Sequence, residues 1–315
     1  METRILDALK NTADAAAIAE ATTLLLRGEL VAFPTETVYG LGAIATDATA
    51  IQRVYEVKGR PISNPLIVHV GDVDDIRLIA EVDDRVRLLA ERFMPGPLTL
   101  VLKALDVVPT IARAGLDTVA VRIPDHPVAL RLLNASGPLV GPSANLSGRP
   151  SPTTAQHVIA DLDGLLAAVI DGGPCRVGIE STVVDLTGAS PVILRPGEIE
   201  AAAIAEALGV PVSTSIAGER SPGTRFRHYA PTVPVRLVIG HDVPTVEAGV
   251  RLVLTTTKHL ARFSRSVTRV LSSENFYAQL RNADEAGFLE VIIYIEPDEL
   301  PHGLLDRVMR ASGAQ

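Results

Sequence analysis

The chain has 315 residues, of which 47% are hydrophobic and 3% are aromatic, with no tryptophan. This composition is typical of a globular protein whose core is built from Ala, Val, Leu and Ile, and it excludes a disordered chain. The formal net charge of −8 argues against a protein whose main task is to bind nucleic acid, because that task usually leaves a basic surface across a whole domain.

The N-terminal segment and the cysteine usage indicate a cytoplasmic protein. The first 20 residues mix acidic with apolar side chains and do not predict a signal peptide. No run approaches the ~20 consecutive apolar residues that a membrane-spanning helix needs. Cys175 is the single cysteine, so an internal disulfide and a cysteine-rich metal site are excluded, and the chain fits a reducing compartment. We therefore expect no membrane contact.

Helices and strands alternate through the first two thirds of the chain. Hydrophobic periodicity predicts helices at 13–27, 48–57, 74–93, 125–134, 153–161 and 198–208. Short β-branched segments predict strands at 30–33, 66–70, 98–103, 118–123, 139–141, 167–170, 182–185 and 192–194. This alternation favours an α/β domain with a mixed sheet, which we place at residues 1–208.

A second, smaller unit follows an aperiodic segment. Residues 209–233 are rich in Gly, Pro, Ser and Thr, which predicts a linker. After it, strands are predicted at 235–239, 252–255, 268–271 and 291–295, and helices at 244–251, 274–286 and 301–311. We therefore predict a small Rossmann-like parallel α/β domain over residues 234–315.

The loop KGRPISNP, residues 58–65, places Lys58 and Arg60 two residues apart after a predicted helix. In an extended chain such side chains face the same way, so both cations can contact one polyanion while Asn64 adds a directional hydrogen bond. Only 4 of the 29 basic residues are lysines, which favours a specific use for this ammonium. The loop predicts a phosphate-binding site, and a solvated turn remains the alternative.

Two further loops after predicted strands are rich in hydroxyl and amide groups, and strand ends are where α/β proteins bind ligands. These loops are FPTETVYGLG, residues 33–42, and GPSANLSGRPSPT, residues 141–153. Their neutral groups suit a ribose, a phosphate or a carboxylate, and come from Thr35, Thr37, Ser143, Asn145, Ser147 and Ser151. Neither loop is a GxGxxG fingerprint or a P-loop, and ordinary polar turns explain both as well.

Arginines occur where other segments end or turn. Arg122 closes a predicted strand, which suits bidentate contact with a carboxylate, although a surface salt bridge is the alternative. ESTVVDL and ILRPGEI add Ser181 and Arg195. The linker stretch SPGTRFRHYAP is typical of a lid over an anionic ligand that contains a ring, through Arg225, His228 and Tyr229. No GxSxG, HExxH or CxxC motif and no D-x-D metal loop supports a hydrolase triad or a metal held by protein side chains.

Seven motifs together, in order, resemble the threonylcarbamoyl-AMP synthase family: FPTETVYGLG, KGRPISNPLIVHV, PGPLTLVL, VAVRIPDHP, GPSANLSGRPSPT, ESTVVDL and ILRPGEI. SPGTRFRHYAP and LLDRVMRAS are similar to its two-domain form. The resemblance implies a YrdC-like twisted mixed sheet with helices and a concave ligand cleft. It also implies a nucleotidyltransferase that makes threonylcarbamoyl-AMP and pyrophosphate from L-threonine, bicarbonate and ATP, for N6-threonylcarbamoyladenosine in tRNA.

The resemblance also implies roles for individual residues. Lys58 and Arg60 would be catalytic and hold the triphosphate. The remaining ATP contacts would come from Asn64, Thr118, Ser143, Asn145, Ser151, Arg195, Arg225, His228 and Tyr229. Threonine would lie among Thr35, Thr37, His69, Arg122 and Ser181. Mg²⁺ would accompany ATP, held by its phosphates and by no protein side chain.

The product would pass to a tRNA threonylcarbamoyl transferase complex, so weak or no direct tRNA binding is expected. Two alternatives stay open at this point. One is an RNA-binding module, since a basic cleft does not distinguish a triphosphate from an RNA backbone. The other is a carbamoyl-transfer domain of the hydrogenase-maturation type, which shares the fold. The task of the second domain is not readable, and regulation or support of the lid is a hypothesis.

Overall fold

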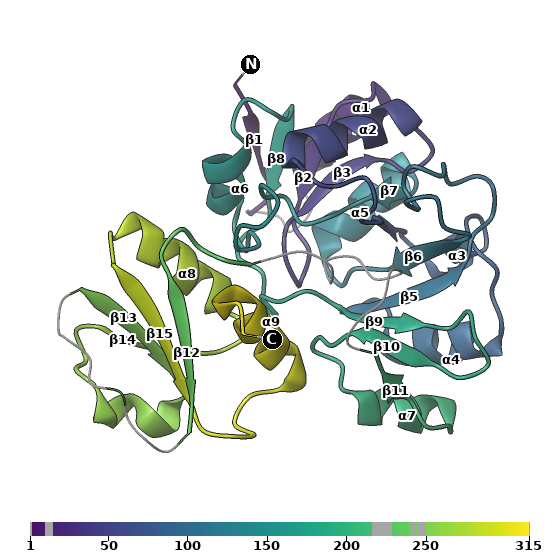
Figure 1. The fold of residues 1–315 in the computed structure, drawn as a ribbon. Coiled ribbons are helices and arrows are strands. Elements are labelled where there is room, and N and C mark those ends of the chain that lie inside the picture. The colour runs from purple at the N-terminus through teal and green to yellow at the C-terminus, as the bar shows by residue number, and fades with distance from the viewer. Residues whose placement is uncertain (1, 10–14, 216–228, 241–243, 245–249, 315) are drawn as a thin grey trace.

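The computed structural model describes residues 2–9, 15–215, 229–240, 244 and 250–314 (Figure 1). They form two α/β units, each built on its own sheet. Strands of the first sheet extend to Thr214, and strands of the second begin at Val235. The mixed α/β architecture with a separate parallel sheet confirms the predicted fold class.

The larger sheet is mixed and, among the described residues, has eleven strands in the order β1-β8-β2-β3-β7-β4-β6-β5-β9-β10-β11. Its first strands are β1 (Arg4–Asp7), β2 (Val31–Phe33), β3 (Gly40–Ile44), β4 (Ile67–His69), β5 (Leu98–Lys103) and β6 (Thr118–Arg122). The others are β7 (Leu139–Val140), β8 (Ala168–Asp171), β9 (Thr182–Asp185), β10 (Val192–Arg195) and β11 (Ser213–Thr214). The accompanying helices are α1 (Ala15–Leu26), α2 (Ala48–Lys58), α3 (Val73–Ile76), α4 (Asp84–Phe93), α5 (Pro127–Ser136), α6 (Ala155–Leu162) and α7 (Ala201–Leu208).

Both faces of this sheet are covered because alternate strand side chains point in opposite directions. Val31 and Phe33 of β2 pack with α1 and α5 in one core, whereas Ala32 packs with α2, α4 and α6 in the other. The ring of Phe33 meets the ring of His69, at the end of β4, edge to face with the ring centres 5.7 Å apart. The face that carries Phe33 therefore continues over β4, where a small aliphatic cluster lies: Ile67, Val101, Ala120, Val183 and Leu194.

In the described ranges, the smaller unit has a sheet of four strands, all parallel to their neighbours, in the order β12-β15-β13-β14. Its strands are β12 (Val235–Ile239), β13 (Arg251–Thr255), β14 (Thr268–Val270) and β15 (Glu290–Ile295). A 3₁₀ helix, η1 (Thr257–Arg262), follows β13, and the helices are α8 (Phe276–Glu285) and α9 (His302–Ser312). In Figure 1, α8 and α9 lie on the side of the small sheet that faces the larger unit.

The two units meet with their backbones in contact. A Cβ built on Gly303, in α9, would lie 2.4 Å from the carbonyl oxygen of Gly197, and one built on Gly197 would lie 2.7 Å from the carbonyl oxygen of Glu180. At a second point, a Cβ on Gly178 would lie 2.5 Å from the carbonyl oxygen of Ser273. Glycine is required at these positions because no side chain fits between the two backbone segments.

Several elements differ from the sequence predictions. Strands β1, β3 and β11 were not expected, because β1 and β11 are short edge strands and the glycines of β3 weaken a strand pattern. The helix predicted at 74–93 is two helices, since Asp72 and Asp83 each cap a new helix. Most of the helix predicted at 244–251 lies outside the described residues, and Arg251, its last residue, begins β13.

Candidate functional site

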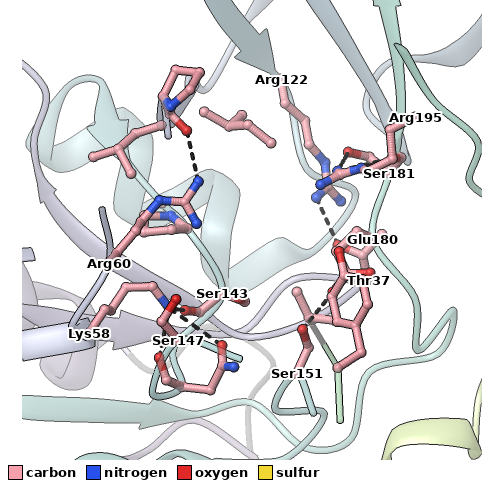
Figure 2. A pocket seen from close by; sticks show the side chains of 18 of the residues that line it. Thr37, Lys58, Arg60, Arg122, Ser143, Ser147, Ser151, Glu180, Ser181 and Arg195 are labelled. Carbon is pink, nitrogen blue, oxygen red and sulfur yellow. Dashed lines mark hydrogen bonds between the residues drawn. The ribbon is translucent and has the colours of Figure 1, made fainter. Parts of the chain in front are cut away.

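A pocket opens over the face of the large sheet that carries Ile67, His69 and Arg122 (Figure 2). Its mouth is open to solvent, and inside it the centre of a water-sized sphere can occupy about 60 Å³. Of the residues that the structure describes, five basic side chains line it, namely Lys58, Arg60, Arg122, Arg149 and Arg195, together with one carboxylate, that of Glu180. This excess of positive charge suits an anionic ligand.

Lys58 and Arg60 reach the pocket by a route that differs from the predicted one. Lys58 is the last residue of α2, and Gly59 ends that helix in the left-handed conformation with φ +59°. The chain is therefore not extended here, and the argument from side chains two apart in a strand is wrong for this loop. Both cations nevertheless line the same pocket, because the left-handed glycine turns the chain back over the end of α2.

Lys58 is buried and its ammonium is held by backbone carbonyls. Its Nζ donates to the carbonyl oxygens of Ser143 and Asn145, the latter at 2.7 Å. Burial, and then the charge of Arg60, lowers the pKa of Lys58 well below its ordinary value. The carbonyl contacts neutralise no charge, so the protonated ammonium keeps its full charge for a ligand.

Arg60 is held in the same way. Its Nε donates to the carbonyl oxygen of Asn64 at 3.1 Å, and its Nη2 to that of Pro65 at 2.9 Å. Burial lowers the pKa of Arg60 to about 10, so the guanidinium stays charged at neutral pH. We call Lys58, Arg60, Ser143 and Asn145 the Lys58 end of the pocket.

On the opposite side of the pocket lie Thr37, Arg122 and Ser181 (Figure 2). We call these residues, with His69 beside Arg122, the Arg122 end. Arg122 donates through Nη1 to Thr37 Oγ1 at 2.7 Å, and its Nη2 lies 2.7 Å from Glu36 Oε1. The side chains of Arg122 and Glu36 are 5% and 0% exposed, so this is a buried ion pair. Glu36 was not predicted, although it stands between the two threonines in the quoted motif.

Thr35 has a supporting position behind this end. Its Oγ1 donates to the carbonyl oxygen of Val38 at 2.6 Å and accepts from the backbone N–H of Thr37 at 3.1 Å. The Thr35 and Thr37 hydroxyls lie 2.9 Å apart, so they contact one another instead of facing a ligand side by side. Thr35 shapes the turn, and Thr37 lines the pocket.

Two more predicted residues are joined directly. Arg195 donates through Nη2 to Ser181 Oγ at 3.1 Å and through Nε to the Ser181 carbonyl oxygen. A register shift in β10 between Ile193 and Arg195 places Arg195 opposite Val183 of β9. These contacts join a residue expected beside ATP to one expected beside threonine.

Histidine 69 is buried at the end of β4 against Arg122. Burial, and then the positive charge of Arg122, lowers the pKa of His69 to about 3. The ring is therefore neutral at physiological pH, and it can offer a ligand one hydrogen-bond donor and one acceptor but no positive charge.

Glu180 is a pocket residue that the sequence reasoning passed over, although the motif ESTVVDL begins with it. Its Oε1 accepts from Ser151 Oγ at 2.5 Å, and its Oε2 accepts from Tyr277 Oη at 2.8 Å and Arg307 Nε at 2.7 Å. Burial would raise the pKa of Glu180, but Arg307 and Arg195 reverse this and lower it to about 2. The signal was a carboxylate beside a predicted ligand residue.

The structure brings most of the predicted site residues into this one pocket: Thr37, Lys58, Arg60, His69, Arg122, Ser143, Asn145, Ser151, Ser181, Arg195 and Tyr229. Three others are buried and do not line it, namely Thr35, Asn64 and Thr118. Thr118 pairs with Lys103 at the start of β6. Arg225 and His228 lie outside the described residues.

In the described part of the chain, one group of side chains has metal-ligand geometry, and it lies in the small domain. It consists of His259, Glu296 and Glu299, with ligand atoms within 4.8 Å of one another. Lys258 Nζ contacts the carboxylates of Glu296 and Glu299 at 2.5 and 3.2 Å. An ammonium therefore already supplies the positive charge at this group.

None of the helices in the described ranges has the length and apolar character needed to cross a membrane. The fold and the pocket together define an α/β protein with a buried, cation-lined site for a small anionic ligand. Residues 23–197 match a family model described as telomere recombination, and residues 197–313 match one described as the C-terminal domain of threonylcarbamoyl-AMP synthase.

Individual relatives agree with these models. A threonylcarbamoyl-AMP synthase of Bacillus subtilis is 41% identical, over 95% of this chain and 93% of its own length. One of Pyrococcus abyssi is 49% identical over 68% of this chain and 65% of its own length. The chain therefore belongs to the threonylcarbamoyl-AMP synthase family.

Solved structures give the same picture. The crystal structure of P. abyssi Sua5 complexed with L-threonine matches with a TM-score of 0.89 at 36% identity, over 99% of this chain and 98% of that one. The crystal structure of E. coli YciO matches at a TM-score of 0.57 and 24% identity, over 64% of this chain, and supports the fold of the larger unit alone.

Proposed function

We propose that this chain makes L-threonylcarbamoyladenylate and pyrophosphate from L-threonine, bicarbonate and ATP, as a nucleotidyltransferase that serves tRNA N6-threonylcarbamoyladenosine modification. The observation that carries the proposal is the pocket itself. Among the described residues, Lys58 and Arg60 line it with contacts to backbone carbonyls, whereas Arg122 and Arg149 line it in ion pairs with Glu36 and Asp161. The lining carboxylate, Glu180, is already paired with Arg307. A polyanion such as a triphosphate is the ligand that this charge distribution favours.

The chemistry needs little from the protein beyond position and charge. The amine of threonine and bicarbonate give a carbamate and water. A carbamate oxygen then attacks the α-phosphorus, the new O–P bond forms, and the bond to the β-phosphate oxygen breaks as pyrophosphate leaves. The attacking oxygen is already anionic, so a protein nucleophile is not required. Lys58 and Arg60 would stabilise the charge on the transferring and leaving phosphates.

Cys175 does not serve as a covalent nucleophile in this scheme. Burial, and then the negative charge of Glu36, raises the pKa of its thiol far above its ordinary value. The thiol is thus protonated and enclosed, which leaves direct attack by the carbamate as the simpler route.

Threonine would lie at the Arg122 end. The P. abyssi relative has been solved in complex with L-threonine, which supports a threonine site in this chain. Arg122 would contact the threonine carboxylate while Thr37 and the neutral ring of His69 hydrogen-bond the amino acid. Since Arg122 is paired with Glu36, the carboxylate would share the guanidinium with that side chain.

Mg²⁺ would enter with ATP. Both oxygens of the lining carboxylate Glu180 already accept hydrogen bonds, so the phosphates would supply the ligands of the ion. When bound, the ion would neutralise phosphate charge. We further propose that the protein is cytoplasmic and passes its product to a tRNA threonylcarbamoyl transferase complex, without tight tRNA binding of its own.

The test is pyrophosphate release from ATP, measured with and without threonine and bicarbonate, and with serine and glycine in place of threonine. We expect release that requires both co-substrates, with the adenylate detected by mass spectrometry. No release with any amino acid, together with tight and strongly salt-dependent RNA binding, would contradict the proposal and assign the chain to an RNA-binding class.

A further inference from the structure

The small domain contacts the pocket through two buried arginines. Arg281 of α8 and Arg307 of α9 are 3% and 0% exposed, and both bind carboxylates of the large domain. Arg307 Nε lies 2.7 Å from Glu180 Oε2, and Arg281 Nη2 lies 2.8 Å from Asp161 Oδ2. Both ion pairs join elements more than 100 positions apart in the chain.

Both arginines are connected by hydrogen bonds to the loop at residues 143–151, at the adjacent positions Pro150 and Ser151. Glu180 uses its other oxygen, Oε1, to accept from Ser151 Oγ (Figure 2). Arg281 Nη2 donates directly to the carbonyl oxygen of Pro150. The loop that ends at Ser151 begins with Ser143 and Asn145, whose carbonyl oxygens bind the ammonium of Lys58. The loop is therefore attached to the Lys58 end at its start and to the small domain at its end.

Aromatic side chains complete the contact. Tyr277 of α8 donates its hydroxyl hydrogen to Glu180 Oε2 at 2.8 Å. The rings of Tyr277 and Tyr229 have centres 5.4 Å apart, and the Arg307 guanidinium lies over the ring of Tyr229 at 5.5 Å. The next backbone N–H, that of Ala230, donates to the carbonyl oxygen of Gly148 in the same loop. The loop thus has three separate contacts: Ser151 with Glu180, Pro150 with Arg281, and Gly148 with Ala230.

We propose that the small domain is a positioning element for the ATP site, with Arg307 and Arg281 as positioning residues that hold Ser151 and Pro150. Arg307 orients the Glu180 carboxylate, and that carboxylate orients the hydroxyl of Ser151 inside the pocket. Neither arginine touches the reacting atoms. The inference rests on the proposed function, because it assigns the affected ligand as ATP.

The first experiment measures kcat and KM for ATP and for threonine in the full chain. Arg307→Ala is expected to raise the KM for ATP at least tenfold and to change the KM for threonine less than twofold, and Arg307→Lys to restore part of the loss. The matched control is His302→Ala, which removes another contact between the domains, to Glu200, away from the loop. It is expected to change neither KM.

Tyr277→Phe distinguishes misplacement of the loop from a failure to fold. It removes one hydrogen bond to Glu180 and leaves no unpaired buried charge. It is expected to raise the KM for ATP two- to fivefold while the protein stays fully folded at the assay temperature. In a Ser151→Ala background the same change should have no further effect, because both act through Glu180. Multiplicative effects would contradict the inference, as would an increase in the KM for threonine alone.

The inference and the proposed function fail in different ways. If the unaltered chain releases pyrophosphate with threonine and the variants match it in KM for ATP, the inference is wrong and the function stands. If the unaltered chain shows no such release, the function is wrong. Titration calorimetry with ATP then still decides whether Arg307→Ala weakens nucleotide binding relative to His302→Ala, and equal affinities would overturn the positioning role.

Discussion

The two ends of the pocket hold their cations in different ways. At the Lys58 end, the ammonium and the guanidinium of Arg60 are held by backbone carbonyls, whereas at the Arg122 end the guanidinium is held by the carboxylate of Glu36. Carbonyl contacts fix a cation and leave its charge uncompensated, but a carboxylate cancels it. The Lys58 end is thus built to attract several negative charges, and the Arg122 end to orient one carboxylate.

The distinction between the two ends would be wrong if the enzyme did not need the charge of Lys58. Lys58→Ala is expected to lower kcat/KM for ATP by about 100-fold or more, the cost typical of removing a preorganised electrostatic group. The threonine requirement should change much less. Lys103→Ala, at an exposed lysine at the end of β5, is the matched control and should leave steady-state rates unchanged. Equal losses toward both substrates would remove the distinction between the two ends.

Acid unfolding tests how much the Glu180 carboxylate contributes to the stability of the folded protein. The pKa of Glu180 is lowered in the folded protein from its ordinary value of 4.5 to about 2. Its stabilisation is therefore fully present above pH 4.5 and is lost as the pH falls through about 2, by roughly 3 kcal/mol in total. Urea unfolding at pH 5 and pH 3 measures how far the free energy of unfolding falls between the two. The fall should be smaller for Glu180→Gln than for the unaltered chain. Equal losses would argue against this ion pair.

Arg122→Lys tests the other end with the positive charge retained. Loss of the bidentate geometry is expected to raise the KM for threonine by about 10-fold, because a hydrogen bond to a charged group is worth about 1.5–3 kcal/mol. The KM for ATP should stay within about twofold. The lysine keeps a cation beside Glu36, so the melting temperature checks that the buried carboxylate has not been left unpaired.

The smallest effect is expected from pH at His69. Since burial and Arg122 lower its pKa to about 3, its ring should give NMR signals that do not shift between pH 5 and pH 8. Free histidine in the same samples should titrate near pH 6.5. A midpoint above pH 5 for His69 would mean that the Arg122 end is more open to water than the structure indicates.

Much of the fold follows from the sequence, because strong periodicity and glycine or aspartate signals identify helices such as α2. The failures have local causes. Pattern reasoning places residues within their own element, so it expected two parallel hydroxyls at Thr35 and Thr37 where the turn bonds one to the other. Glu180 could not be ranked above other acids, since its partners Tyr277 and Arg307 lie 97 and 127 residues away.

The backbone contact between Gly197 and Gly303 also decides how the two domains can move. Side chains at an interface can change rotamer and let packed elements slide in small steps. Here α9 lies directly against the carbonyl of Gly197, which in turn lies against the backbone at Glu180. At this one contact no side chain lies between the two backbones, so α9 cannot slide past Gly197 through a change of rotamer. Any sliding of α9 at this point would have to move two backbones apart, which makes the contact a fixed point of the domain interface.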